Sequence, residues 1–223
     1  MSKRRIVITG MGIISPTGNS VAESWSNVSK GISGITPLVA FDPETFSSKI
    51  AGSIKNLDLG KYLDAKEARR SDPFIHYGIA SAKDAIADAN LPAHLPNTGV
   101  MIGAGIGGLY TIETNYEKFL NSGARKISPY FVPGSIVNMI SGHISIEYGY
   151  TGPNLSLVSA CATASHCIGL SARLIQTGDA DVMIAGGSEH ATTPLGVGGF
   201  CAARALSTRN DDPTRASRPW DKN

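Results

Sequence analysis

One cysteine follows an apolar run directly and stands at the start of a helical pattern, which favours nucleophilic chemistry. Residues 156–190 read SLVSACATASHCIGLSARLIQTGDADVMIAGGSEH, and Cys161 comes directly after the first apolar run. A sulfur at the start of a helix faces unpaired N–H groups and the positive end of the helix dipole, which favour the nucleophilic thiolate. Free cysteines are also often plain packing residues. The position of Cys161 by itself therefore leaves both interpretations open.

The other cysteines and a nearby histidine lack this placement. Cys167 falls inside the expected helix and is predicted to pack, and Cys201 in GGFCAARAL is predicted to be inert. Three cysteines do not form a disulfide framework, so reduced thiols are expected. His166 lies five residues after Cys161, about 500° around a helix, so the two side chains are not in line. We predict a structural or supporting role for His166.

A glycine-rich segment offers a competing chemistry. Gly103, Gly105 and Gly108 match the pattern G-x-G-x-x-G after an apolar run, which in other proteins cradles a dinucleotide. Such a site also needs an acidic residue about 20 positions further on, at the end of a second strand, and none stands there. Nucleotide binding is therefore disfavoured, and the glycines are expected to let the backbone pass close to a substrate pocket. No Cys/His spacing suggests zinc, so no metal is expected.

The elements that must position these residues alternate between strand and helix. Strands are predicted at residues 5–9, 100–103, 155–159 and 182–185, and helices at residues 21–30, 111–120, 134–148 and 161–176. The last two helices are expected to be closed by Gly149 and Gly178. A further helix is predicted to start at Asp72-Pro73, with an N-cap followed by proline, and to bury Ile75, Ile79, Ala82 and Ile86. Residues 31–63 lack a clear period and are expected to form loops or an inserted cap. The alternation predicts an α/β fold, with helices on the faces of a parallel or mixed sheet.

The helix expected after Cys161 carries two apolar stripes. They consist of Ala164, Ile168, Ala172 and Ile175 on one side and of Cys167, Leu170 and Leu174 on the other. A helix that is apolar on most sides is expected to be buried. We therefore predict a buried central helix, with Cys161 at the bottom of a pocket.

The bulk composition is that of an ordinary globular protein. The chain has 223 residues, 42% of them hydrophobic, and a net charge of +2, so nothing global points to nucleic acid. The start, MSKRRIVITG, has too short an apolar run for a signal peptide, and no stretch of about 20 apolar residues exists to span a bilayer. A cytoplasmic location is expected. The end, SRPWDKN, brings no closing helix or strand and predicts that the chain is part of a larger protein.

The segment SACATASHCIG resembles the nucleophile segment of the β-ketoacyl-acyl-carrier-protein synthases. Other motifs follow in that family's order: RRIVITGMGIISPTGNS, MIGAGIGGL, RKISPYFVPGSIVNM, GDADVMIAGGSEH, TPLGVGGF and ARALSTRNDDPTRASRPWDKN. The elongating class of type II synthase is the most similar. The resemblance implies a thiolase-like layered fold, α-β-α-β-α when complete, of which residues 1–223 form the N-terminal half. It also makes Cys161 the expected nucleophile.

The resemblance implies a two-stage acyl transfer in fatty acid elongation. An acyl group passes from the phosphopantetheine of an acyl carrier protein to Cys161, and the carbanion from decarboxylated malonyl carrier protein then attacks it. The Cys161 N–H is expected to stabilise the oxyanion. The family's two catalytic histidines and its lysine are expected beyond this chain, because none of its histidines matches them: His76, His94, His143, His166 and His190. The chain alone is therefore expected to be inactive, and no resident cofactor is implied.

Further positions carry over from the resemblance. Ile106 and Phe200 match residues near the acyl pocket, and Phe131 matches one that reaches across a homodimer interface. Plain packing is the alternative for each. A basic rim that steers acidic carrier proteins is expected from six side chains: Lys66, Arg69, Arg70, Arg125, Lys126 and Arg204. A solvated charged surface is the alternative, and no nucleic-acid or membrane partner is expected.

Two other functions remain open. One is a non-catalytic subunit that binds a carrier protein or another partner. The other is a thiolase-like enzyme that uses coenzyme A thioesters.

Overall fold

The structure is a computed structural model that describes residues 4–221, and the chain divides into two compact units. The first unit comprises Met1–Gly12 and Leu59–His190, and the second comprises Ile13–Asp58 and Ala191–Asn223. Each unit is therefore built from two separated stretches of chain. Cys161 and the glycine-rich segment belong to the first unit.

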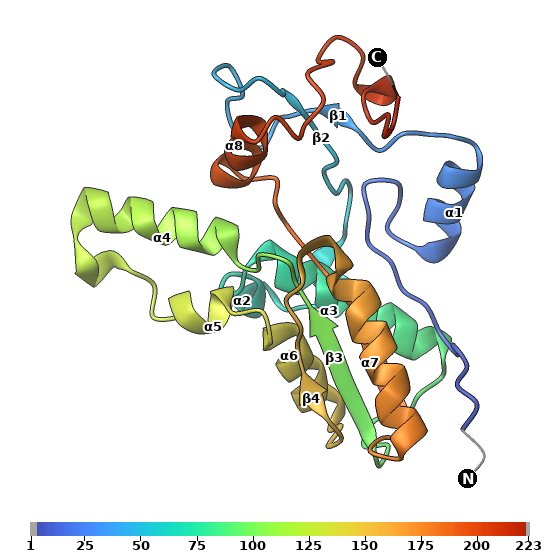
Figure 1. Cartoon of the computed structure of the whole chain (residues 1–223). Helices are drawn as coiled ribbons and strands as arrows, with labels where there is room; N and C mark the ends of the chain where they lie inside the picture. Colours follow the sequence, from blue (N-terminus) through green and yellow to red (C-terminus); the bar gives the residue numbers. More distant parts are fainter. Residues whose placement is uncertain (1–3, 222–223) are drawn as a thin grey trace. The chain divides into compact units, whose positions relative to one another are not determined.

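A parallel sheet of three strands lies at the centre of the first unit (Figure 1). Its order is β4 (Asn154–Leu155), β3 (Thr98–Gly103) and β5 (Val182–Gly187). All six residues of β3 are buried, and each is paired with a residue of β5. Parallel strands joined through helices confirm the predicted α/β class.

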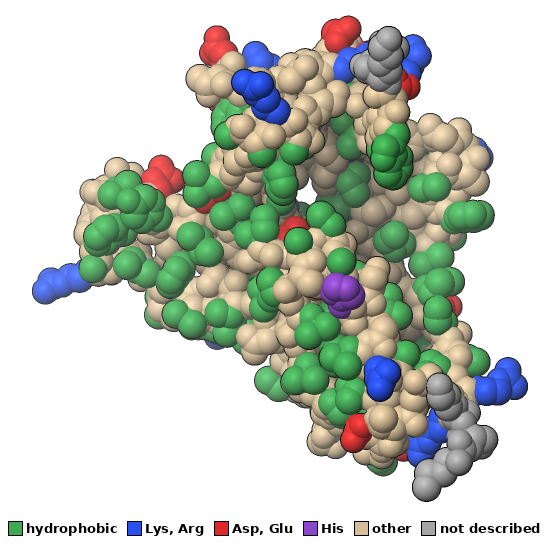
Figure 2. Space-filling model, viewed as in Figure 1, with side chains coloured by type: hydrophobic (Ala, Val, Ile, Leu, Met, Phe, Trp, Pro, Cys, Tyr) green, Lys and Arg blue, Asp and Glu red, His purple; other side chains and the backbone are tan. Residues whose placement is uncertain are grey.

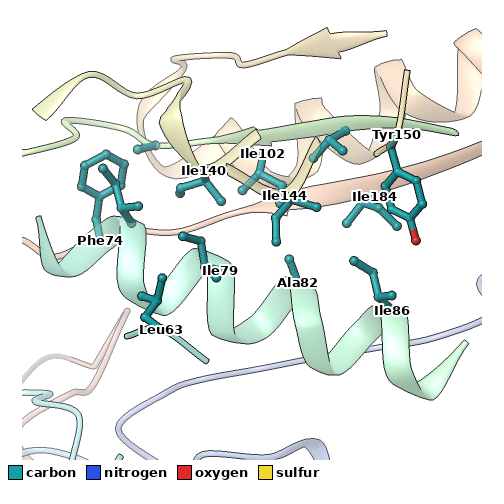
Figure 3. Close-up of a cluster of buried hydrophobic side chains, with 13 residues drawn as sticks. Leu63, Phe74, Ile79, Ala82, Ile86, Ile102, Ile140, Ile144, Tyr150 and Ile184 are labelled. Atoms are coloured by element: carbon teal, nitrogen blue, oxygen red, sulfur yellow. The ribbon is translucent and has the colours of Figure 1, made fainter. Parts of the chain in front are cut away.

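Helices cover both faces of this sheet. α3 (Pro73–Asp88) and α6 (Met139–Tyr148) enclose the main core with Ile102 and Ile184 (Figure 3). α7 (Thr163–Thr177) packs on β3 and β5, and its Cys167 lies beside Gly103. Because successive strand residues point to opposite faces, α7 lies on the face opposite the main core.

The start of α3 confirms a prediction from local sequence. Asp72 caps the helix by accepting a hydrogen bond from the Phe74 amide at 3.2 Å, and Pro73 occupies the first turn. The predicted apolar positions of α3 are all buried: Ile75, Ile79, Ala82 and Ile86.

The prediction of a strand at residues 5–9 is wrong. No strand is assigned there, and the Ile8 side chain is 80% exposed. Apolar β-forming residues become a strand only when a neighbouring strand pairs with them, and no described strand does so. The following residues contact α3 instead, since the Met11 amide donates to Asp88 Oδ2 at 2.9 Å.

The helix predicted at residues 134–148 is interrupted. A short helix, α5 (Phe131–Ser135), precedes α6, and Ile136 between them is extended. The Ser135 carbonyl accepts a hydrogen bond from the Gly108 amide at 3.0 Å and makes no helical bond to Met139. A tertiary contact therefore breaks the helix, whereas its predicted end at Gly149 is confirmed by a left-handed φ of 65°.

The elements around Cys161 are shorter than predicted. β4 ends at Leu155, and a 3-10 turn, η3 (Ala160–Ala162), precedes α7, so Cys161 lies in the turn and not in the helix. The prediction that α7 is buried on most sides is also wrong for the described chain. Only Thr163, Cys167 and Ser171 are buried, and Ile168 is 51% exposed, because the sheet covers one side of α7 alone.

The remaining elements include the predicted helices near residues 21–30 and 111–120. These are α1 (Val21–Ser29) in the second unit and α4 (Leu109–Ser122) in the first. The second unit also contains the antiparallel pair β1 (Thr36–Pro37) and β2 (Ile50–Ala51), the helix α8 (Pro194–Ala202) and the turn η4 (Pro213–Arg215). The first unit adds η1 (Leu59–Lys61), α2 (Ala65–Ala68) and η2 (Ala124–Lys126). Within residues 4–221, no helix is long and apolar enough to cross a membrane.

Candidate active site

Cys161 is exposed on a strained turn that leads into α7. The residue before it, Ala160, has a φ of +52°, a left-handed conformation that L-residues other than Asn, Asp and His rarely adopt. The Cys161 side chain is exposed and does not lie at the bottom of a pocket in the described chain, which corrects that prediction. A solvent-facing sulfur on a bent turn is accessible to an incoming substrate and can attack it.

Thr163 holds this turn from below. Its hydroxyl donates to the Ala160 carbonyl at 2.8 Å and accepts from the Ser159 amide at 2.9 Å. The residue is buried at the first position of α7. The strained Ala160 is thus fixed by hydrogen bonds on both sides, and Cys161 has a rigid base.

Cys161 lies close to the N-terminal end of α7. It comes two residues before the helix begins, and Ala162 at the N-cap offers no side-chain acceptor to the first N–H groups of the helix. Stabilisation of a thiolate by the positive end of the helix dipole stays a prediction.

The glycine-rich loop passes directly beside the turn. A Cβ atom at Gly105 would lie 3.2 Å from Ala160 Cα, and one at Gly103 would lie 2.2 Å from the Leu157 carbonyl oxygen. The glycines thus allow close backbone contacts on the nucleophile side of the sheet, and their predicted place beside a substrate pocket stays a prediction.

The N–H groups of this loop are occupied by an internal carboxylate. Glu189 Oε2 accepts from the Ile106 amide at 2.7 Å, and Oε1 accepts from the Gly107 amide at 3.2 Å. Consecutive amides of this kind form an anion-binding nest, the position that a phosphate takes in a dinucleotide site. The glycine pattern therefore serves an internal acidic group, which further disfavours nucleotide binding.

Cys167 is a packing residue, as predicted. It is fully buried on α7 against the Gly103 region of β3. Burial raises the pKa of the Cys167 thiol above its ordinary value, an effect that the Leu157 and Gly103 backbones partly oppose. Cys201 is half-buried in α8 of the second unit.

His166 contacts the residue that precedes the nucleophile turn. Its Nδ1 and the Ser159 hydroxyl share a hydrogen bond of 2.7 Å. The pair borders an open apolar groove of about 420 Å³, lined by Leu157, Val158, Ser159, Ser165, His166, Gly169, Leu170 and Arg173. This arrangement agrees with the supporting role predicted for His166.

The buried residue Asp72 ties three helices together on the other side of the sheet, through its carboxylate and its backbone amide. Besides capping α3, Asp72 accepts from the Thr111 amide at 2.8 Å, and its own amide donates to the Gly134 carbonyl. His76 and His190 lie near this carboxylate. Burial lowers the pKa of both imidazoles, and the charge of Asp72 partly opposes that shift.

The three predicted pocket residues lie on separate elements. Ile106 is 46% exposed on the glycine-rich loop, and Phe131 is half-buried at the start of α5. Phe200 is exposed on α8 in the second unit. Ile106 alone lies on the loop that contacts the Cys161 turn.

The predicted basic rim is spread over several elements. Lys66 and Arg69 are exposed at α2, while Arg70 lies 4.4 Å from the centre of the Tyr130 ring in a cation–π contact. Arg125 and Lys126 are exposed in η2, after the C-terminal end of α4. Arg204 is exposed in the second unit. In the view of Figure 2, most Lys and Arg side chains lie near the edges, and the middle of the view shows mainly apolar side chains.

A cysteine on a turn between a parallel sheet and a covering helix is the arrangement expected from the resemblance to thiolase-like condensing enzymes, and the comparisons with known proteins identify this class. The chain belongs to the β-ketoacyl synthase family, since the sequence model "Beta-ketoacyl synthase, N-terminal domain" matches residues 3–223. The predicted family and fold class are thereby confirmed.

Named relatives and solved structures agree with this family. The chain is 52% identical to "3-oxoacyl-[acyl-carrier-protein] synthase 2" of Coxiella burnetii, with 100% of the chain and 54% of the relative covered. It is 45% identical to the Staphylococcus aureus (strain COL) protein of the same name, with 98% and 53% covered. The chain thus spans about half the length of these curated relatives.

The fold is shared with solved ketosynthases. A beta-ketoacyl synthase from Burkholderia phymatum STM815 superposes with a TM-score of 0.86 at 25% identity, over 99% of this chain and 55% of that one. A ketosynthase solved in complex with a type II PKS acyl-carrier protein gives a TM-score of 0.75 at 27% identity, over 92% and 58%.

Proposed function

We propose that this chain carries the nucleophile of a 3-oxoacyl-acyl-carrier-protein synthase that elongates fatty acids. The observation that carries the proposal is the exposed Cys161 on its strained turn, at the positive end of α7. The names of the relatives support this reaction for the intact protein, of which this chain would be about half.

In the first step, the Cys161 thiolate attacks the thioester carbonyl carbon of an acyl carrier protein. A new carbon–sulfur bond forms, the oxygen becomes an oxyanion facing the Cys161 N–H, and the phosphopantetheine thiolate leaves and takes up a proton. The hydrogen bonds of Thr163 to Ser159 and Ala160 hold the backbone next to this N–H in place.

In the second step, malonyl carrier protein loses carbon dioxide and its carbanion attacks the acyl-enzyme. Bond formation expels the Cys161 thiolate and leaves a 3-oxoacyl carrier protein. The family resemblance assigns this step to two histidines and a lysine outside this chain. Within the chain, His166 is hydrogen-bonded to Ser159, and His190 makes an aromatic contact with Tyr77. The chain alone is therefore expected to be inactive in condensation.

The acyl chain is proposed to lie against Ile106, with Phe200 and a homodimer partner's copy of Phe131 as further walls. The support is strongest for Ile106, whose loop contacts the residue before the nucleophile. Exposed apolar side chains next to Phe131, at Val132 and Ile136, are consistent with a subunit interface there.

An acyl carrier protein is the proposed partner, and its phosphopantetheine is the only prosthetic group required. The solved neighbour with its acyl-carrier protein supports this pairing. Lys66 and Arg69 are the first docking residues to test because both are exposed, whereas Arg70 is engaged with Tyr130. Arg125, Lys126 and Arg204 remain part of the proposed docking set, and the cytoplasm is the proposed location.

The decisive experiment maps acylation in the intact protein that contains this chain. The protein is incubated with a palmitoyl carrier-protein thioester, digested and analysed by mass spectrometry. The acyl group is expected on Cys161, with complete loss in Cys161→Ala and retention in the control Cys201→Ala. An acyl group on another residue, or an unchanged Cys161→Ala variant, would refute the assignment.

A further inference from the structure

The carboxylate of Glu189 binds the backbone of the glycine-rich loop beside the Cys161 turn. It follows β5 and accepts hydrogen bonds from two consecutive amides, those of Ile106 and Gly107. Hydrogen bonds to an ionised acceptor are roughly twice as strong as neutral ones. The loop between β3 and α4 is thus tied to the end of β5 by a charged clamp.

The base of this clamp is itself fixed. The neighbouring Ser188 donates its amide to the Gly103 carbonyl at 3.0 Å and its hydroxyl to the Phe74 carbonyl at 2.7 Å. Glu189 therefore projects from a point anchored to both β3 and α3. Any movement of the loop has to break bonds to a rigid position.

The clamped loop lies against the nucleophile turn. A Cβ atom at Gly105 would lie 3.0 Å from Glu189 Oε2 and 3.2 Å from Ala160 Cα. The carboxylate, Gly105 and the residue before Cys161 are therefore packed so closely that a methyl group on Gly105 would make tight contacts with both neighbours. A shift of the loop would change both the turn and the direction of the Ile106 side chain.

Packing fixes the two ends of this loop, whereas its middle depends on Glu189. Ala104 is buried in the main core, and the Gly108 amide donates to the Ser135 carbonyl, but the Ile106 side chain between them is 46% exposed. Removing the carboxylate would leave two amides without their acceptor, at a cost that favours rearrangement.

We propose that Glu189 is a positioning residue that fixes the 104–108 loop as the wall beside Cys161 and thereby sets selectivity for acyl chain length. It acts through Ile106 and Gly107 and does not contact the reacting atoms. The inference rests on the proposed function, because it assumes that acyl thioesters are loaded on Cys161. Long chains contact more of this wall than short ones, so they depend more on its position.

The test compares Glu189→Ala, Glu189→Gln and the control Glu117→Ala in the intact protein. Glu117 is an exposed acid on α4, in the same unit. Cys161 loading is measured with butanoyl and hexadecanoyl carrier-protein thioesters, and amide hydrogen exchange is followed at Ile106 and Gly107. We expect Glu189→Ala to slow hexadecanoyl loading about ten- to hundred-fold and butanoyl loading much less. Glu189→Gln keeps one acceptor oxygen and should be intermediate.

The outcomes separate this inference from the proposed function. If the unmodified protein loads Cys161 but Glu189→Ala slows both thioesters equally or neither, the positioning role is wrong. Unchanged amide exchange in Glu189→Ala would also overturn it. If the unmodified protein does not load Cys161 at all, the proposed function fails, while the exchange data still report on the clamp.

Discussion

Cys161 and Cys167 lie six residues apart in one segment, yet their surroundings differ in every respect. Cys161 is exposed on a turn whose preceding residue has a left-handed backbone. Cys167 is fully buried on the sheet side of α7, where burial raises its pKa. Cys167 packs α7 against the sheet, and Cys161 lies on the exposed turn that precedes this packed helix.

The same contrast separates the two glycines that lie next to them. Gly103 has no side chain because Leu157, Thr163 and Cys167 fill that space. Gly105 has none because the Glu189 carboxylate and Ala160 lie there. One glycine serves the packing of α7, and the other serves the contact between the clamped loop and the nucleophile turn.

The largest expected difference is in thiol reactivity. Iodoacetamide should modify Cys161 more than about 10³-fold faster than Cys167, because Cys167 reacts only when the surrounding structure opens. Peptide mapping after timed labelling measures both rates. Denaturant should bring them close together, and similar rates in the native protein would contradict the contrast.

Alanine substitutions at Gly103 and Gly105 should affect two different quantities, the free energy of unfolding and the rate of Cys161 acylation. Gly103→Ala is expected to lower the free energy of unfolding by roughly 3 kcal/mol, because its Cβ would overlap the Leu157 carbonyl and the Thr163 methyl. Gly105→Ala should cost about 1 kcal/mol or less but slow Cys161 acylation, since its contacts are tight and not overlapping. Urea unfolding and loading rates measure the two effects, and a reversed order would break the comparison.

The strain at Ala160 should respond to side-chain shape. Ala160→Val is expected to destabilise the protein by about 2 kcal/mol, because β-branched residues tolerate a left-handed backbone poorly. Ala160→Gly should stay within about 1 kcal/mol of the original protein. Equal free energies of unfolding for the two variants would show that the turn is not strained.

The smallest expected effect is a pH dependence of the unfolding free energy, which comes from histidines on the α3 side of the sheet, away from both cysteines. Burial lowers the pKa of His76 and His190 in the folded protein. As the pH falls below the ordinary histidine pKa of about 6.5, the unfolded chain therefore binds protons before the folded protein does. The stability from these neutral imidazoles is present above that pH and is lost as the pH falls through it. Unfolding free energies at pH values of about 7.5 and 5.5 should differ less in His76→Gln.

The matched control for this effect is His94→Asn, which replaces an exposed histidine by a residue that tolerates its left-handed φ of 56°. It should keep the pH dependence of the original protein. If His76→Gln and His94→Asn behave alike, burial of His76 does not contribute to that dependence.

Local signals predicted much of the fold. The cap at Asp72, the helix ends at Gly149 and Gly178, and the buried strand β3 all follow from residues close together in the sequence. Failures occurred where a distant partner decides the outcome. Residues 5–9 lack a paired strand, and the Ser135 carbonyl bonds to Gly108, which interrupts the expected helix.

The candidate site shows the same division. The position of Cys161 before a helix and the glycines of the adjacent loop were visible in the sequence. The Thr163 hydrogen bonds and the left-handed Ala160 had only a weak signal, a threonine near the helix start. The Glu189 clamp had none, because 82 residues separate Glu189 from Gly107.

The sequence by itself determined the family, the alternation of strands and helices, and the identity of the nucleophile candidate, because these depend on residue type and short spacing. Only the tertiary structure decided that Cys161 is exposed, that Cys167 is buried, and that Glu189 occupies the glycine-rich nest. Burial and hydrogen bonding depend on which distant segments come into contact, and a pattern of neighbouring residues does not specify those contacts.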